Sequence, residues 1–262
     1  MKKFTFLFAL VLFGFSSFGQ HTLTLEDAVL NGRKYYPQGL IMPQWVPATD
    51  AYSHLIDGYQ TMAIIDAKSG EESGRITAGQ INDALTAANQ EVSLRGTWML
   101  EWQDDHTVRF TEGGTLYSYD MNTSEITAHF TMAEGNANVH LSTYGNAAYT
   151  VGNNVFVSWN EDGSTVQVTK HENPNIVSGQ AIARSEFGIT EGLFWNPKGD
   201  AIAFYEKDES AVTNYPLLDI TSTPGSLNEI KYPMAGQGSE YAKVGVYRKG
   251  SKKPIYLDTN GV

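Results

Sequence analysis

Residues 147–169 read AAYTVGNNVFVSWNEDGSTVQVT, and this stretch decides the fold. Its first apolar run is followed by the turn Gly152-Asn153, and a second apolar run leads into another turn that ends at Gly163. Glycine and asparagine are the residues that best tolerate the positive φ angles of tight hairpin turns. The stretch therefore predicts antiparallel β-strands joined by short turns.

The same order of strand, Gly or Asn turn, strand and Asp or Asn turn occurs in two earlier stretches. These are residues 51–71, AYSHLIDGYQTMAIIDAKSGE, and residues 107–125, TVRFTEGGTLYSYDMNTSE. Units of this kind at periods of about 40–50 residues are typical of the four-stranded blades of a β-propeller. A two-sheet β-sandwich also has short strands and regular turns, and it is the alternative. The repeats predict a mainly β chain, with an incomplete propeller of about four blades over residues 41–262.

One or two short helices are expected beside the strands. Thr77 and Gln80 form a capping box, and the apolar residues Ile81, Ala84 and Leu85 follow at helical spacing. A shorter amphipathic piece begins near Thr24. That piece lies in residues 21–40, which we expect to form an N-terminal segment outside the blades.

The first twenty residues have the pattern of a secretory signal. Lys2 and Lys3 precede an apolar run over residues 4–15, and small residues follow before Gln20. This run is too short to span a bilayer. We therefore expect residues 1–20 to be a signal peptide and the protein to be exported, to the periplasm, the extracellular space or the outer cell surface.

The composition excludes several classes of function. The chain has 18 Lys and Arg residues against 29 Asp and Glu residues, a net charge of −11. Such an acidic chain is not expected to bind nucleic acid, because little positive charge is available to neutralise phosphates. The chain has no cysteine, which excludes disulfide bonds, thiol catalysis and cysteine-ligated zinc.

Familiar catalytic motifs do not occur in these 262 residues. There is no Gly-x-Ser-x-Gly nucleophile elbow and no His-Glu-x-x-His zinc motif. The six histidines are scattered without a short metal-ligand spacing, and the acidic pair Asp104-Asp105 reads as solvated turn charges. We therefore expect no catalytic residue, no metal and no cofactor in this chain.

Arg184 and Glu186 are the charged pair that stands out. They lie in a stretch flanked by glycine and alanine, just before a strongly apolar run. In a β-strand, residues i and i+2 face the same side, so both charges would project together. The simpler interpretation is a surface ion pair, worth at most about 1 kcal/mol.

A resemblance to a known family rests on four stretches. They are GQAIARSEFGI (179–189), GLFWNPKGDAIAFYEKDESAV (192–212), YPLLD (215–219) and YPMAGQGSEYAKVGVY (232–247). Through them the chain resembles the dipeptidyl peptidase IV family, the branch of the prolyl oligopeptidase clan with a β-propeller in front of an α/β-hydrolase domain. The similarity covers residues 21–262. The motifs most resemble those of secreted enzymes of Bacteroidetes-type bacteria, which include prolyl tripeptidyl peptidases.

The resemblance implies the role of a few residues. In this family an acidic motif on the propeller binds the free N-terminal ammonium group of the substrate, and Glu186 is the matching residue. Typical members have two adjacent glutamates, whereas Ser185 precedes Glu186 here. Release of dipeptides and release of tripeptides therefore both stay open. Family members also place a propeller arginine against the substrate backbone, for which Arg184 and Arg109 are the candidates.

The function expected from the resemblance is that of the N-terminal propeller part of a secreted post-proline serine exopeptidase. Its substrates would be peptides with a free N-terminus and a proline near it, and the complete enzyme would be able to form a homodimer. The Ser, Asp and His of the C-terminal hydrolase domain are not expected among these residues, so the chain alone should be inactive. The chain stops just after the turn signal Asn260-Gly261, which favours a fragment. The alternatives are a non-catalytic propeller module for peptide binding or scaffolding, and a secreted carbohydrate-binding β-sandwich.

Overall fold

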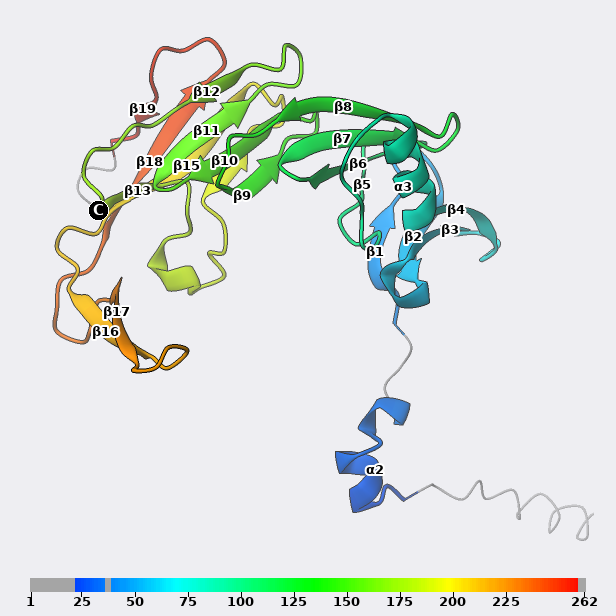
Figure 1. Ribbon diagram of the computed structural model, residues 1–262, viewed down its shortest axis with the longest axis horizontal. Helices are drawn as coiled ribbons and strands as arrows, with labels where there is room; N and C mark the ends of the chain where they lie inside the picture. The colour runs from blue at the N-terminus through cyan, green and yellow to red at the C-terminus, as the bar shows by residue number, and fades with distance from the viewer. Residues whose placement is uncertain (1–21, 36–38, 259–262) are drawn as a thin grey trace, which may run out of the picture. The chain divides into compact units, whose positions relative to one another are not determined.

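The computed structural model describes residues 22–35 and 39–258, and the chain divides into two units, residues 1–40 and 41–262 (Figure 1). The predicted signal peptide and the turn at Asn260-Gly261 lie outside the described residues. In the described part, no helix is both long enough and apolar enough to cross a membrane.

Within residues 22–35, the described part of the first unit, lie a short helix, α2 (Leu25–Val29), and a 3-10 turn, η1 (Gly32–Tyr35). The helix begins as the sequence predicts, because the Thr24 side chain accepts a hydrogen bond from the Asp27 backbone N–H and Asp27 caps Thr24 in return. No residue of α2 is buried.

The second unit begins with two regular antiparallel sheets. The first has the order β1 (Ile41–Trp45), β2 (Ala51–Ile56), β3 (Thr61–Asp66) and β4 (Glu72–Thr77). The second has the order β5 (Glu101–Trp102), β6 (Thr107–Glu112), β7 (Thr115–Asp120) and β8 (Glu125–Thr131). The 3-10 turn η2 (Asp57–Tyr59) joins β2 to β3, and Gly113-Gly114 joins β6 to β7, so both predicted hairpin turns are confirmed.

The third sheet repeats this plan with β9 (Asn136–Leu141), β10 (Ala147–Val151), β11 (Asn154–Ser158) and β12 (Thr165–Gln167). Strands β10 and β11 pair residue by residue from Ala147 with Ser158 to Val151 with Asn154, around the turn that the sequence identifies. The sheet is therefore a four-stranded meander like the two before it.

The fourth sheet departs from the plan. Its path is β13 (Ile176–Ser178), β15 (Ala201–Asp208), β18 (Tyr241–Arg248) and β19 (Ile255–Tyr256), while β14 (Leu193–Trp195) also pairs with β15. Two insertions interrupt it. One contains the 3-10 turn η3 (Ala183–Ser185), and the other is the separate hairpin β16 (Asn214–Asp219) and β17 (Ser226–Lys231).

The buried core runs from each sheet to the next. Phe110 of β6 lies in one cluster with Leu55 of the first sheet, and Leu116 of β7 lies in a second cluster with Tyr149 of the third sheet. A third cluster joins Val157 of β11 to the fourth sheet. Successive packing of four sheets is the arrangement of propeller blades, whereas a sandwich has one core between two sheets. The prediction of a mainly β, partial propeller of about four blades is confirmed.

Helix α3 (Ala78–Ala87) connects the first two sheets and also matches its prediction. Thr77 and Gln80 form the capping box, and Ile81 and Leu85 are fully buried against the first core cluster. All strand pairs among the described residues are antiparallel, so these residues contain none of the parallel sheet of an α/β-hydrolase domain.

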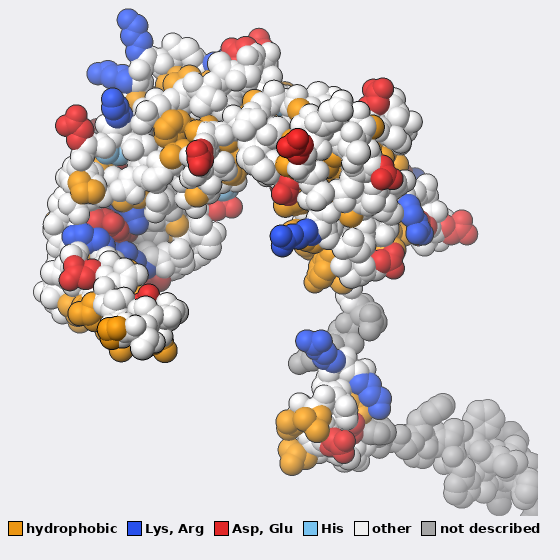
Figure 2. Space-filling view, viewed as in Figure 1, with side chains coloured by type: hydrophobic (Ala, Val, Ile, Leu, Met, Phe, Trp, Pro, Cys, Tyr) orange, Lys and Arg blue, Asp and Glu red, His pale blue; other side chains and the backbone are white. Residues whose placement is uncertain are grey.

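Exposed apolar side chains gather on the inserted hairpin, where Figure 2 shows a group of hydrophobic residues. Leu218 and Leu227, opposite each other on β16 and β17, are 66% and 70% exposed. The hairpin is thus unlike β6 and β7, which combine buried and half-buried positions, because its strands are exposed along almost their whole length.

Candidate functional site

The candidate site is built around η3, whose backbone is strained. Ala183, Arg184 and Ser185 have φ angles of 51°, 55° and 60°, and Phe187 has a φ of 57°. Residues other than glycine avoid this left-handed region, because it costs them roughly 1–2 kcal/mol each. Strained backbone of this kind persists only where the surroundings hold it, and it clusters at binding and active sites.

The strand geometry expected for Arg184 and Glu186 is wrong. The backbone N–H of Glu186 donates to the Ala183 carbonyl, which closes a turn instead of extending a strand. The two side chains form no ion pair with each other, so the simpler interpretation as a local ion pair is also wrong. Contacts from later segments, above all the hydrogen bond from the Ala183 backbone N–H to Glu240, hold this turn.

Two carboxylates from later segments, Glu240 and Glu209, contact this turn. The Glu240 carboxylate accepts a hydrogen bond of 2.8 Å from the Ala183 backbone N–H and lies 3.8 Å from the Arg184 guanidinium. Glu209 lies 3.6 Å from Arg184 Nη1 and 3.1 Å from the Lys207 ammonium group. The Lys207 and Glu209 side chains are each only 11% exposed. The network therefore holds the turn through charges that are mostly out of water.

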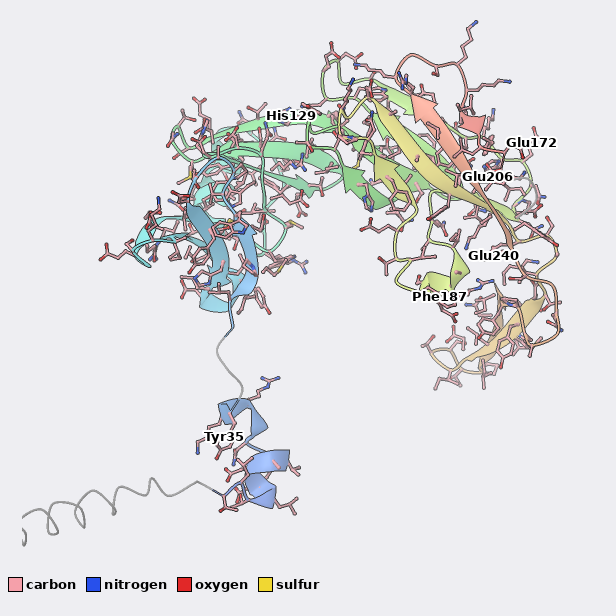
Figure 3. The ribbon with its side chains drawn as sticks, turned by 180° about the vertical axis from the view of Figure 1, so that it is seen from behind. Tyr35, His129, Glu172, Phe187, Glu206 and Glu240 are labelled. Atoms are coloured by element: carbon pink, nitrogen blue, oxygen red, sulfur yellow. The ribbon has the colours of Figure 1, made fainter. Side chains whose placement is uncertain are left out.

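Arg184 lines two cavities. One, of about 320 Å³, is lined by Arg184, Glu186, Phe187, Tyr232 and Glu240, among others. The other, of about 460 Å³, is lined by Arg184 and by polar groups that include His140, Glu191 and Lys207. Figure 3 shows Phe187 and Glu240 close together between η3 and the inserted hairpin. Arg184 also lies over the Tyr232 ring, 5.9 Å from its centroid.

Glu186 is the exposed acid of the smaller cavity. Its side chain makes no hydrogen bond or ion pair within the described part of the chain. Its neighbour Phe187 is 88% exposed. An unpaired carboxylate and an exposed aromatic ring at one cavity can bind a positively charged organic group.

Arg109 lies elsewhere. Its guanidinium donates hydrogen bonds to the Ser142 carbonyl at 2.5 Å and to the Glu101 carboxylate at 3.2 Å, which links β6 to the end of β9 and to β5. Its side chain is only 11% exposed. The structure does not bring Arg109 together with Arg184 or Glu186, and a role for it in substrate binding stays a prediction.

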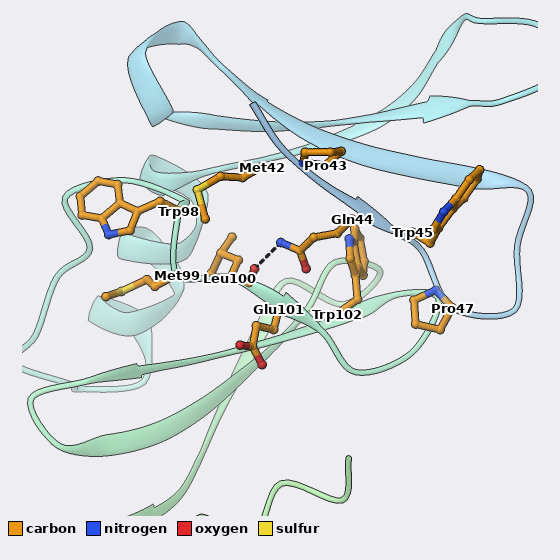
Figure 4. A pocket seen from close by; sticks show the side chains of 10 residues that line it. All are labelled: Met42, Pro43, Gln44, Trp45, Pro47, Trp98, Met99, Leu100, Glu101 and Trp102. Atoms are coloured by element: carbon orange, nitrogen blue, oxygen red, sulfur yellow. Dashed lines mark hydrogen bonds between the residues drawn. The ribbon is translucent and has the colours of Figure 1, made fainter. Parts of the chain in front are cut away.

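A larger cavity, of about 580 Å³, lies between β1 and the residues around β5 (Figure 4). Trp45, Trp98 and Trp102 line it, and the Gln44 side-chain amide crosses it to donate a hydrogen bond of 2.8 Å to the Leu100 carbonyl. Its one ionisable lining residue, Glu101, is already paired with Arg109. The cavity therefore lacks the free charges of the smaller one.

Two serine–histidine contacts in the described residues resemble parts of a catalytic triad. Ser178 lies 2.8 Å from His171 Nε2, and Ser118 lies 2.9 Å from His129 Nε2. Glu206 approaches the same His171 nitrogen, at 3.4 Å, so it does not orient the ring from the opposite nitrogen as a triad requires. Tyr256 donates to Glu206, and burial together with this carboxylate raises the pKa of the Tyr256 hydroxyl. This cluster joins β13, β15 and β19 and is structural.

A second cluster of ionisable residues lies around His106. Asp104, Asp105 and His106 lie close enough to share an ion, but all are partly or fully exposed. The hydrogen bond with Asp105 raises the pKa of His106, and this local pairing accounts for the cluster. It fits the prediction of solvated turn charges.

Sequence reasoning did not identify Glu240, Lys207 or Glu209 as part of the site. Glu240 is 54 residues away from Glu186 in the chain and lies between two strands, without a local motif. Strand β15 offers no local signal for Lys207 and Glu209, because alternation places them on the half-buried face of Ala203 and Tyr205, and their burial exists only in the folded structure.

Comparisons with known proteins agree with the fold. A model of the family described as "Dipeptidyl peptidase IV (DPP IV) N-terminal region" matches residues 95–261. A solved structure from Bacteroides ovatus, described as a dipeptidyl aminopeptidase IV, is 36% identical with a TM-score of 0.72, and the match covers 91% of this chain and 32% of that one. Porphyromonas gingivalis dipeptidyl peptidase 4 is 18% identical with a TM-score of 0.66, over 92% of this chain and 35% of that one, and so shows likeness of fold alone. The chain spans about a third of the length of both structures.

Proposed function

The chain belongs to the family of the dipeptidyl peptidase IV N-terminal region, and on that premise we propose that it recognises the amino end of substrates for an exported post-proline serine exopeptidase. The observation that carries the proposal is the unpaired Glu186 carboxylate at a cavity beside a strained turn. The hydrolysis itself belongs to a catalytic domain that the described residues do not contain.

Glu186 binds the substrate's N-terminal ammonium group. Only the end of a peptide carries this group, so a carboxylate at a fixed place measures how many residues precede the bond to be cut. The α-amine has a pKa of roughly 7.7–8.0 in model peptides and is largely charged at neutral pH. A hydrogen bond between two charged groups contributes about 1.5–3 kcal/mol to binding.

Arg184 binds the carbonyl oxygen next to that amine. Its Nε and Nη2 atoms are buried without a hydrogen-bond partner, so they have donors to offer. Arg184 shares the cavity with Glu186, whereas the Arg109 guanidinium is already held by Glu101 and Ser142. Arg184 is therefore the better of the two predicted candidates.

In the complete enzyme, the site presents the peptide to a serine. The serine hydroxyl attacks the carbonyl carbon after proline, a histidine takes the hydroxyl proton and later gives it to the leaving amine, and an aspartate orients the histidine. The propeller part contributes position: holding the amine and the adjacent carbonyl aligns the scissile bond, which is how binding energy raises the rate. Whether two or three residues precede that bond depends on the span from Glu186 to the serine.

The test uses the full-length enzyme and two substrates that differ by one amine. Glycyl-prolyl-p-nitroanilide carries the α-amine, and acetyl-prolyl-p-nitroanilide has a hydrogen in its place. Glu186→Gln should lower the ratio of their kcat/KM values about tenfold or more, mainly by raising KM for the free amine. The control Glu134→Gln changes an exposed acid between β8 and β9 and should leave the ratio unchanged. An unaltered ratio in Glu186→Gln would mean that Glu186 does not bind the amine.

A further inference from the structure

A second carboxylate, that of Glu240, lines the smaller cavity, and one of its two oxygens has no hydrogen bond. Glu240 Oε1 accepts from the Ala183 backbone N–H, but Oε2 is buried and lacks a hydrogen-bond partner among the described residues. The Glu240 side chain is only 8% exposed. A buried carboxylate oxygen without a partner is costly, because it has lost its water. Such an atom in a cavity wall points to a ligand that supplies the missing donor.

The facing atom is also unsatisfied. Arg184 Nη2 lies 3.8 Å from Glu240 Oε2, too far for a direct hydrogen bond, and it too is buried without a partner. One free acceptor and one free donor, 3.8 Å apart in the wall of one cavity, match a ligand that offers a donor and an acceptor within the same residue. The first residue of a peptide does so, with its ammonium group and its carbonyl oxygen.

The charges around the turn lead to the same kind of ligand. Among the residues that line this cavity, Arg184 contributes one positive charge, against two negative charges from Glu186 and Glu240. The group is therefore short of one positive charge. Glu209 is occupied by Lys207 and Arg184, which leaves Glu186 and Glu240 as the carboxylates that face the cavity. A single cation between these two would balance the cluster.

We propose that Glu240 is a substrate-binding residue, and that its Oε2 accepts a hydrogen bond from the same ammonium group that Glu186 binds. The second carboxylate of the site thus comes from the connection between β17 and β18, not from a neighbour of Glu186 in sequence. The inference rests on the proposed function, since it places a further residue around the same amine. It also ties the site to the base of the inserted hairpin, because Tyr232 and Glu240 belong to that connection.

Glu240→Gln is the appropriate variant. Glutamine keeps an oxygen that can accept from the Ala183 N–H, so the strained turn retains its support, while the negative charge is removed. In the full-length enzyme, the kcat/KM ratio of glycyl-prolyl- to acetyl-prolyl-p-nitroanilide should fall about tenfold. The same ratio is measured in parallel for Glu186→Gln, for the double variant and for the control Glu134→Gln. Because both carboxylates bind one group, the double variant should lose less than the product of the two single effects.

The outcomes separate this inference from the proposed function. A fall in Glu186→Gln with no change in Glu240→Gln would overturn the role of Glu240 and leave that of Glu186 standing. An equal loss of kcat/KM for both substrates in Glu240→Gln would show a purely structural residue, and fully multiplicative effects in the double variant would place Glu240 at a different group; either result overturns the inference. If neither variant changes the ratio, both proposals fail.

Discussion

The second and the fourth sheets show two ways of using the same architecture. In the second sheet, β6 and β7 pair in full register from Thr107 with Asp120 to Glu112 with Thr115, and Phe110 and Tyr119 are buried beside that register. In the fourth sheet, β13 and β14 both pair with β15, and insertions carry charged, strained and exposed residues. The regular sheet gains stability from apolar packing, whereas the irregular one holds charges out of water around a cavity.

The difference teaches where this fold can carry a binding site. The β6–β7 hairpin lies between β5 and β8, so its backbone groups pair within the sheet, and its buried side chains pack in the core. An insertion between β13 and β14 can hold its backbone in unfavourable conformations, because Lys207, Glu209 and Glu240 from later segments support it. Three pairs of substitutions test this contrast.

The largest effect is expected from removing a buried ring. Phe110 is 1% exposed in β6, and Phe187 is 88% exposed in the candidate site. Phe110→Ala should lower the free energy of unfolding by about 3–5 kcal/mol, because it leaves a cavity in the core. Phe187→Ala should change it by no more than about 0.5 kcal/mol. Denaturant unfolding of both variants measures this, and a similar loss in each would erase the contrast between the regions.

A buried charge should come next. Lys207→Met leaves Glu209 in a largely buried place with Arg184 as its remaining partner, at 3.6 Å. The loss of unfolding free energy should be about 3 kcal/mol, the low end for breaking a buried ion pair. Lys68→Met, which breaks an exposed pair with Asp50, is the matched control and should have no measurable effect. If Lys207→Met were as mild as the control, the charge network would not support the turn.

The smallest effect should have opposite signs in the two regions. Ala183 has a φ of 51°, a conformation that strains alanine but not glycine. Ala183→Gly should therefore raise the free energy of unfolding by about 0.5–1 kcal/mol. This net gain allows for the greater freedom of glycine in the unfolded chain. Ala147 is fully buried in β10, and Ala147→Gly should lower the same quantity by about 1 kcal/mol. Thermal unfolding of the two variants compares the signs, and a loss in Ala183→Gly would show that the turn is unstrained.

The fold could be predicted where its causes are local. The turns at Asp57-Gly58, Gly113-Gly114 and Gly152-Asn153 and the capping box at Thr77 act through residues a few positions apart. The fourth sheet was harder to predict. Strand β13 pairs with β15 across the insertion, as Ile176 does with Asp208, and no short-range pattern encodes such a pairing.

The candidate site could be predicted only in part. Arg184 and Glu186 were found through their shared stretch, and the structure places both at one cavity, although on a turn instead of a strand. Arg109 was a match of position alone, and the structure places it in a contact between sheets. Its pairing depends on the Ser142 carbonyl, which no pattern around residue 109 can reveal.

The sequence by itself determined the class of fold, the repeated hairpins and the family. Strand alternation, turn residues and family motifs all consist of residues that are neighbours in the chain. Only the tertiary structure decided the left-handed turn at Ala183–Ser185 and the group of charges around it. The physical reason is that these depend on segments far apart in the chain: Glu240 reaches Ala183 across 57 residues, and the burial that makes its free oxygen informative exists only once the sheets have packed.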